Sequence, residues 1–188
     1  LRSKSSRGFD LAAGASPRIV SAPKLRFHGD ETVEEVLRAI LSSTISHLLG
    51  NQPAAEDDLN IEGLHQYRVA LRRLMSILAL MRQLVPSPAL DDLRDRAKKH
   101  MQGLGNARDW DVFIHETLPA VSEACAEVGG FDVLGRAAAD MQQAARNNAR
   151  SAMVHSDNAR FQIAISLWLN RKPWREDSAV QTLMEMPA

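Results

Sequence analysis

The chain has 188 residues, with 23 basic and 23 acidic side chains and a formal net charge of zero. This balance argues against a general nucleic-acid binder, which usually carries a basic domain, and no apolar run reaches the roughly 20 residues that span a bilayer. The single cysteine, Cys125, excludes an internal disulfide and favours a reducing, cytoplasmic location.

The N-terminal part of the chain divides into a tail and a first helix. Residues 1–30 contain several Gly, Pro and Ser residues and no sustained apolar period, so we expect a basic linker or N-terminal tail there. The first helix begins at the capping box Thr32-x-x-Glu35. Gly50, followed by Pro53, should end it.

The rest of the chain has apolar residues at helical spacing, separated by Gly, Asn and Pro turn signals. No stretch alternates with the period of a strand, and the helix-favouring residues Ala, Leu, Arg and Met are common. We therefore expect an all-α, antiparallel helical bundle over residues 31–188. The next expected helices are 61–85 and 89–104, followed by one that is capped by Asn106 and interrupted at Pro119. A long helix over 131–154 should have Leu134 and Met141 facing inward. The last elements are a helix that is capped by Asp157 and ends at Pro173, and a final turn within 176–186.

The charges are unevenly distributed along the chain. Residues 65–108 hold 9 Lys and Arg against 3 Asp and Glu. On a helix that turns about 100° per residue, the apolar residues of this segment share one side. The cationic side chains on the other side are His65, Arg68, Arg72 and Arg73.

These stacked cations point to an anionic ligand, because an anion lying across them relieves their mutual repulsion. The planar fork of Arg suits phosphate, and a protonated His65 can donate from both ring nitrogens. The alternative is a solvated face of long side chains. Val69 and Leu80 share this face, which argues against its lying wholly in water.

Further cations follow on the expected third helix. Arg94 and Lys98 are four residues apart and share a face, so they could extend the basic surface. The alternative is ordinary surface pairing, because Asp91 and Asp95 are spaced to contact Lys98 or Lys99.

Two other groups of residues are candidates. Asp109 and Asp111 are expected to cap the fourth helix and to hold Arg108 toward a ligand, although a plain helix start would explain the same pattern. Arg146 and Arg150, four residues apart on the Ala-rich helix, could line the same surface, with a solvated stripe as the alternative.

Metal and cofactor sites are not expected. Glu62-x-x-His65 has the spacing of one ligand pair in di-iron bundles, but the sequence offers no second pair, and the nearby arginines would repel a cation. Phosphate-loop, nucleophile-elbow and zinc-ligand spacings are also missing from the sequence.

Two segments carry a family resemblance. GLHQYRVALRRL, at 63–74, resembles the signature of the CHAD family, the conserved histidine α-helical domain. LGNARDWDVF, at 104–113, resembles that family's second motif, and the two stand in the family's order and spacing. Ser3–Phe9 also resembles the junction that follows a CYTH triphosphate-tunnel domain in two-domain relatives. The resemblance covers residues 31–175.

The resemblance implies a non-catalytic helical module that binds inorganic polyphosphate, with no membrane partner. The ligand residues implied by motif position are His65, Arg68, Arg72, Arg73 and Arg108, with Lys98 as a further cation. CHAD domains usually contain two related bundles, and this chain ends before a second His/Arg/Lys helix. It therefore resembles the first half, and pairing with a second copy is a further expectation.

Two other functions stay open at this stage. The chain could be the helical part of a triphosphate-hydrolysing enzyme whose catalytic domain lies outside it. It could also be a nucleic-acid or protein interaction module that uses the same basic face, although scarce aromatic residues disfavour stacking on single-stranded nucleic acid.

Overall fold

The computed structural model describes residues 12–14, 17–57, 60–85 and 87–188. Within these ranges the regular secondary structure is helical, and the β-type pairing is one isolated bridge between Thr32 and Pro187. The predicted all-α fold is therefore confirmed. The CYTH-junction segment, Ser3–Phe9, lies outside the described residues, as does part of the predicted tail.

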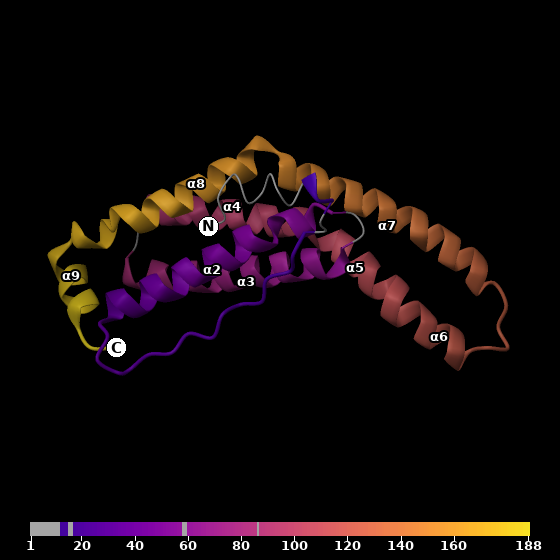
Figure 1. Ribbon diagram of the computed structural model, residues 1–188, viewed down its shortest axis with the longest axis horizontal. Helices are drawn as coiled ribbons and strands as arrows, with labels where there is room; N and C mark the ends of the chain where they lie inside the picture. Colours follow the sequence, from indigo (N-terminus) through magenta and orange to yellow (C-terminus); the bar gives the residue numbers. More distant parts are fainter. Residues whose placement is uncertain (1–11, 15–16, 58–59, 86) are drawn as a thin grey trace.

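The core of the fold is a group of long, closely packed helices (Figure 1). Helix α2 (Val33–Ala55) runs beside α3 (Ile61–Leu84), α4 (Pro88–Gly103) returns along α3, and α8 (Ser156–Arg171) lies against α2 and α4. Their apolar faces meet as the helical spacing predicts. The buried core includes Leu41, Leu48, Leu64, Tyr67, Leu71, Leu74, Leu78, Leu90, Phe161, Ile165 and Trp168.

Helix α2 continues past the stop that the sequence predicts. Gly50 and Pro53 lie inside it, and it ends at Ala55. Ala54 is fully buried against α3, and a Cβ on Gly63 would overlap the Ala54 backbone. This close packing between the two helices outweighs the local cost of Gly and Pro within a helix.

The residues that precede α2 contact its C-terminal part. Asn51 is buried in α2, and its side-chain amide donates to the carbonyl of Val20 at 2.8 Å and to that of His47 at 2.9 Å. Its Oδ1 accepts from the backbone N–H of Val20 at 2.9 Å. Residues 17–28 form no helix, but this contact holds part of the predicted linker against the bundle.

A second, more extended region follows α4. Helix α5 (Gly105–Val112), a π-helical turn (Phe113–Thr117) and α6 (Leu118–Ala124) lead away from the core, and α7 (Phe131–Val154) returns to it (Figure 1). The interruption predicted at Pro119 is present as this π-helical turn. The proline lacks the N–H that would donate to His115 in a regular α-helix.

The far end of this α6–α7 hairpin corrects one prediction. Leu134 and Met141, which were expected to face inward, are 45% and 53% exposed. Ala138, Ala145 and Ala149 are the buried residues of that helix. The periodicity identifies the apolar face of α7, but α7 extends beyond the core that could cover it.

Two predicted helix caps are also wrong. Helix α5 begins at Gly105, with Leu104 as its cap and no side-chain capping bond, so Asn106 lies inside the helix. One residue separates α4 from α5, which leaves no room for an extended capping residue. Helix α8 is capped by His155, whose Nδ1 accepts from the N–H of Asp157 at 3.3 Å.

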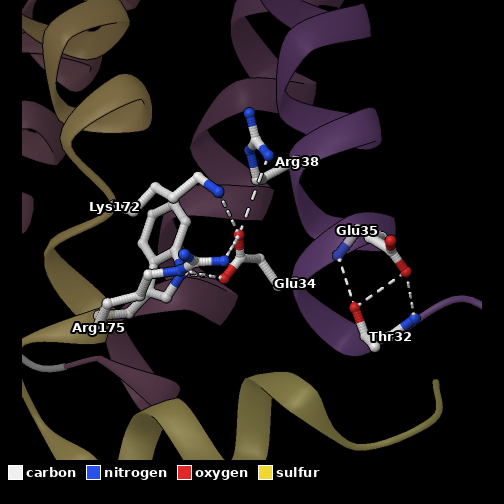
Figure 2. A network of polar contacts seen from close by, with 7 residues as sticks. Thr32, Glu34, Glu35, Arg38, Lys172 and Arg175 are labelled. Atoms are coloured by element: carbon white, nitrogen blue, oxygen red, sulfur yellow. Dashed lines mark hydrogen bonds and ion pairs between the residues drawn. The ribbon is translucent and has the colours of Figure 1, made fainter.

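The C-terminal segment is tied to the start of α2 by an ionic cluster around Glu34 (Figure 2). A short 3-10 turn (Pro173–Arg175) and α9 (Ser178–Glu185) follow α8. The buried Glu34 carboxylate lies 2.8 Å from Nζ of Lys172, and it accepts from Arg175 at 2.9 and 3.0 Å and from Nε1 of Trp174 at 3.1 Å. Burial opposes its ionisation, but these contacts hold the pKa of Glu34 at about 2.

The predicted capping box stands directly beside this cluster. The Thr32 hydroxyl accepts from the N–H of Glu35 at 3.3 Å, and the Glu35 carboxylate accepts from the N–H of Thr32 at 2.8 Å (Figure 2). The start of α2 is thus fixed both by its own side chains and by the C-terminal segment.

Candidate functional site

The two motifs identified in the sequence meet in the fold. Arg68 on α3 donates from Nη1 to the carbonyl of Leu104 at 2.6 Å. Leu104 is the residue between α4 and α5, and Arg108 follows one turn later on α5. This hydrogen bond therefore joins the first motif to the second and sets Arg108 beside α3.

Electrostatic effects on Arg68 show that the cations are crowded. Burial lowers the pKa of Arg68, and the neighbouring charges of Arg72 and Arg108 lower it further. The carboxylate of Asp109 acts in the opposite direction. Three guanidinium groups from two helices thus lie in one region. We call His65, Arg68, Arg72, Arg73 and Arg108 together the basic face.

The rest of the basic face lies along α3. Arg72 and Arg73 are exposed, and His65 is half-buried one turn before Arg68. Among the residues that the structure describes, neither Arg68, Arg72 nor Arg73 forms an ion pair.

Arg73 is close enough to α2 for its charge to act on a residue of that helix. Its charge contributes to lowering the pKa of the buried His47, although burial of His47 is the larger cause. The Nε2 atom of His47 lies 3.2 Å from Oε1 of Gln66. The basic face is consequently broad, because its cations spread from the α5 side of α3 to the α2 side.

Arg108 differs from the arginines of α3 in having an anionic neighbour. Its Nη2 lies 3.5 Å from Oε1 of Glu116, on the π-helical turn. The sequence predicts that Asp109 and Asp111 hold this arginine. Among the described residues, the carboxylate that forms an ion pair with it is that of Glu116 instead.

Arg94 and Lys98 lie on α4, the helix that packs against α3. Asp91 contacts Nε of Arg82 on α3 at 2.7 Å and Nη1 of Arg94 at 3.9 Å, so it does not pair with Lys98 as the spacing suggested. Lys98 is exposed on α4, and its place in the basic face stays a prediction.

Arg146 is held in a buried ion pair between α5 and α7. Its Nε and Nη2 donate to Oδ1 of Asp111 at 2.9 and 2.7 Å, and Gln142 donates to the same oxygen at 2.8 Å. The Asp111 side chain is 0% exposed. This geometry favours a packing role for Arg146. Arg150 is exposed one turn further along α7 and makes contacts of its own.

Comparison with known proteins decides the family. A family model for the CHAD domain matches residues 39–186. The chain belongs to the CHAD family. A solved structure described as the crystal structure of the CHAD domain from the plant Ricinus communis is similar, with a TM-score of 0.71 and 30% sequence identity.

The match to that plant CHAD structure covers 82% of this chain and 51% of the other, so this chain spans about half of its length. No curated protein matches the sequence. The resemblance seen in the two motifs is thus confirmed at the level of family and fold, whereas the assignment to the first half of a CHAD domain stays a prediction.

One polar network of this CHAD bundle was missed by sequence reasoning. The hydroxyl of Tyr67, on the buried side of α3, lies 2.9 Å from Nε2 of His100 and 3.4 Å from Oδ1 of Asn158. Burial raises the pKa of Tyr67 to about 12 and lowers that of His100 to about 4. Tyr67 itself was the sequence signal for this network, since a buried hydroxyl needs a hydrogen-bond partner.

The described part of the chain brings together no group of three or more His, Cys, Asp or Glu side chains that could hold a metal ion. It also contains no helix that is both long enough and apolar enough to pass through a membrane.

Proposed function

We propose that this CHAD chain binds a long phosphate polyanion, inorganic polyphosphate, on its basic face, and that it does so without catalysing a reaction. The observation that carries the proposal is the grouping of Arg68, Arg72 and Arg108 from two helices. Within the described residues, Glu116 is the carboxylate that forms an ion pair with this group, and it reaches Arg108.

The chemistry of these side chains favours phosphate. A guanidinium group keeps its charge and donates two parallel hydrogen bonds to neighbouring phosphate oxygens. Arg68 is partly buried, and its hydrogen bond to Leu104 leaves further donors free to face a ligand.

The arrangement favours a chain of phosphates over a single one. His65, Arg68 and Arg72 follow one another along α3 over seven residues, which is about 10 Å of helix. Arg73 follows directly on the same helix. A polymer can reach several of these cations at once, whereas one phosphate reaches one or two. The family resemblance, which implies polyphosphate, supports the same reading.

Calorimetric titration with long-chain polyphosphate tests the proposal. We expect binding that weakens steeply as salt is raised from about 50 to 200 mM, because each contact releases counterions from the polyanion. The double variant Arg72→Gln/Arg73→Gln should lose about ten-fold or more in affinity and show a shallower salt dependence.

A matched control uses two arginines outside the basic face. Arg136 and Arg160 are 72% and 73% exposed on α7 and α8. The double variant Arg136→Gln/Arg160→Gln removes the same charge and should bind nearly as well as the parent chain. Equal losses of affinity in the two double variants would show that binding depends on net charge alone, and would contradict the proposal.

Two further measurements separate the alternatives. Competition between polyphosphate and DNA at matched phosphate concentration should favour polyphosphate; preference for DNA would support a nucleic-acid module. Phosphate release from tripolyphosphate with Mg²⁺ should stay at the level of buffer alone. Turnover by the purified chain would contradict a purely binding role.

A further inference from the structure

The basic face has a carboxylate of its own at Arg108. The Arg108 side chain is 22% exposed and that of Glu116 is 66% exposed. An exposed carboxylate thus lies 3.5 Å from Nη2 of a largely covered arginine side chain. We infer that Glu116 occupies the place on Arg108 that a phosphate oxygen takes when the ligand binds, and so acts as an internal competitor that sets the affinity of the basic face.

The π-helical turn explains how Glu116 reaches Arg108. Eight residues of regular α-helix rotate by about 800°, which would leave Glu116 about 80° away from the side of Arg108. The Phe113–Thr117 segment instead forms i→i+5 bonds, such as that from the N–H of Leu118 to the carbonyl of Phe113. This wider turn rotates each residue less and returns Glu116 toward Arg108.

The contact is well suited to competition because it is weak. Exposed ion pairs contribute little to folding and are screened by salt, so a polyanion with several contacts can displace Glu116. Asp109, the other acid near the site, influences Arg68 electrostatically without forming an ion pair within the described residues. Glu116 is thus the side chain placed to compete directly.

The inference rests on the proposed function and is tested by the same titration with long-chain polyphosphate at low salt. Glu116→Gln keeps the side-chain size and removes the charge. We expect it to bind about two- to five-fold more tightly than the parent chain. Glu123→Gln is the matched control, because Glu123 is exposed on α6 and makes the same change in net charge.

A double-mutant cycle identifies the partner. In an Arg108→Gln background, Glu116→Gln should change affinity no more than Glu123→Gln does. Circular dichroism checks that each variant keeps its helical content. If the parent chain binds and Glu116→Gln matches Glu123→Gln, the competitor role is wrong while the proposed function stands. If neither the parent chain nor Glu116→Gln binds, both are overturned.

Discussion

The ionic cluster around Glu34 and the basic face contain the same kinds of cation but differ in what lies between them. At the first, Arg38, Lys172 and Arg175 surround a buried carboxylate that they share (Figure 2). At the second, the carboxylate that forms an ion pair among the described residues is the exposed Glu116, which contacts Arg108.

This difference teaches how to separate structural cations from those proposed to bind a ligand. The number of positive charges does not distinguish the two regions. What distinguishes them is a desolvated acid at the centre, since a buried carboxylate destabilises the fold unless the cations around it pair with it. The cations on the basic face have no such role, apart from the hydrogen bond of Arg68 to Leu104.

The largest expected effect comes from removing the central acid. Glu34→Ala leaves Lys172 and the N–H of Trp174 without their acceptor and should lower the free energy of unfolding by about 3–5 kcal/mol. Urea denaturation followed by circular dichroism measures this. Glu123→Ala, at an exposed position on α6, should stay within about 0.5 kcal/mol. A loss at Glu34 as small as that of the control would show that the cluster does not stabilise the fold.

The buried ion pair between α5 and α7 should behave like the Glu34 cluster. Arg146→Met leaves the Asp111 carboxylate buried without its cation, so we expect a loss of about 3 kcal/mol in unfolding free energy. Arg136→Met breaks an ion pair with Asp132 whose side chains are 72% and 70% exposed, and it should cost less than about 1 kcal/mol. Thermal unfolding of both variants compares them directly; similar melting temperatures would show that the Arg146–Asp111 pair does not stabilise the fold.

The dependence of fold stability on pH tests a buried base, His100, in place of the buried acids above. Burial lowers the pKa of His100 to about 4 from its usual 6.5, so between these values the unfolded chain binds more protons than the folded one. Stability should therefore fall as pH drops from about 6.5 to 4 by up to about 3 kcal/mol. His100→Gln should flatten this slope, whereas His115→Gln, at an exposed position, should keep it.

The smallest effect on stability is expected on the basic face. Arg72 is exposed and forms no ion pair among the described residues, so Arg72→Gln should change the unfolding free energy by less than about 0.5 kcal/mol. Removing one of several repelling charges could raise stability slightly. A loss above about 2 kcal/mol by urea denaturation would mean that Arg72 supports the fold, as the cations around Glu34 do.

Local sequence signals predicted the helices well. Apolar spacing placed α3, α4 and α7 within one or two residues of their observed bounds, because each has apolar residues at helical intervals between clear turn signals. The capping box of α2 was also readable, since it depends on two residues three positions apart. The cations of the basic face on α3 could be predicted in the same way, because their spacing is local to one helix.

Partners distant in sequence could not be predicted in this way. Asp111 was assigned to helix capping, but its partner Arg146 is 35 residues away. Glu34 and Arg175 are 141 residues apart, and neither stood out in the sequence. Glu116 was missed because a π-helical turn changes which residues share a side. Such contacts depend on tertiary packing, which single-sequence patterns do not encode.

The absence of a side chain at Gly63 has a consequence for the geometry of the whole basic face. Gly63 lets the backbones of α2 and α3 touch at Ala54, two residues before His65. A methyl group at Gly63 would overlap the Ala54 backbone and force α2 and α3 apart at the start of α3, next to His65. Gly63, the one residue of the motif without a side chain, therefore sets how closely the helix that carries the motif cations approaches α2.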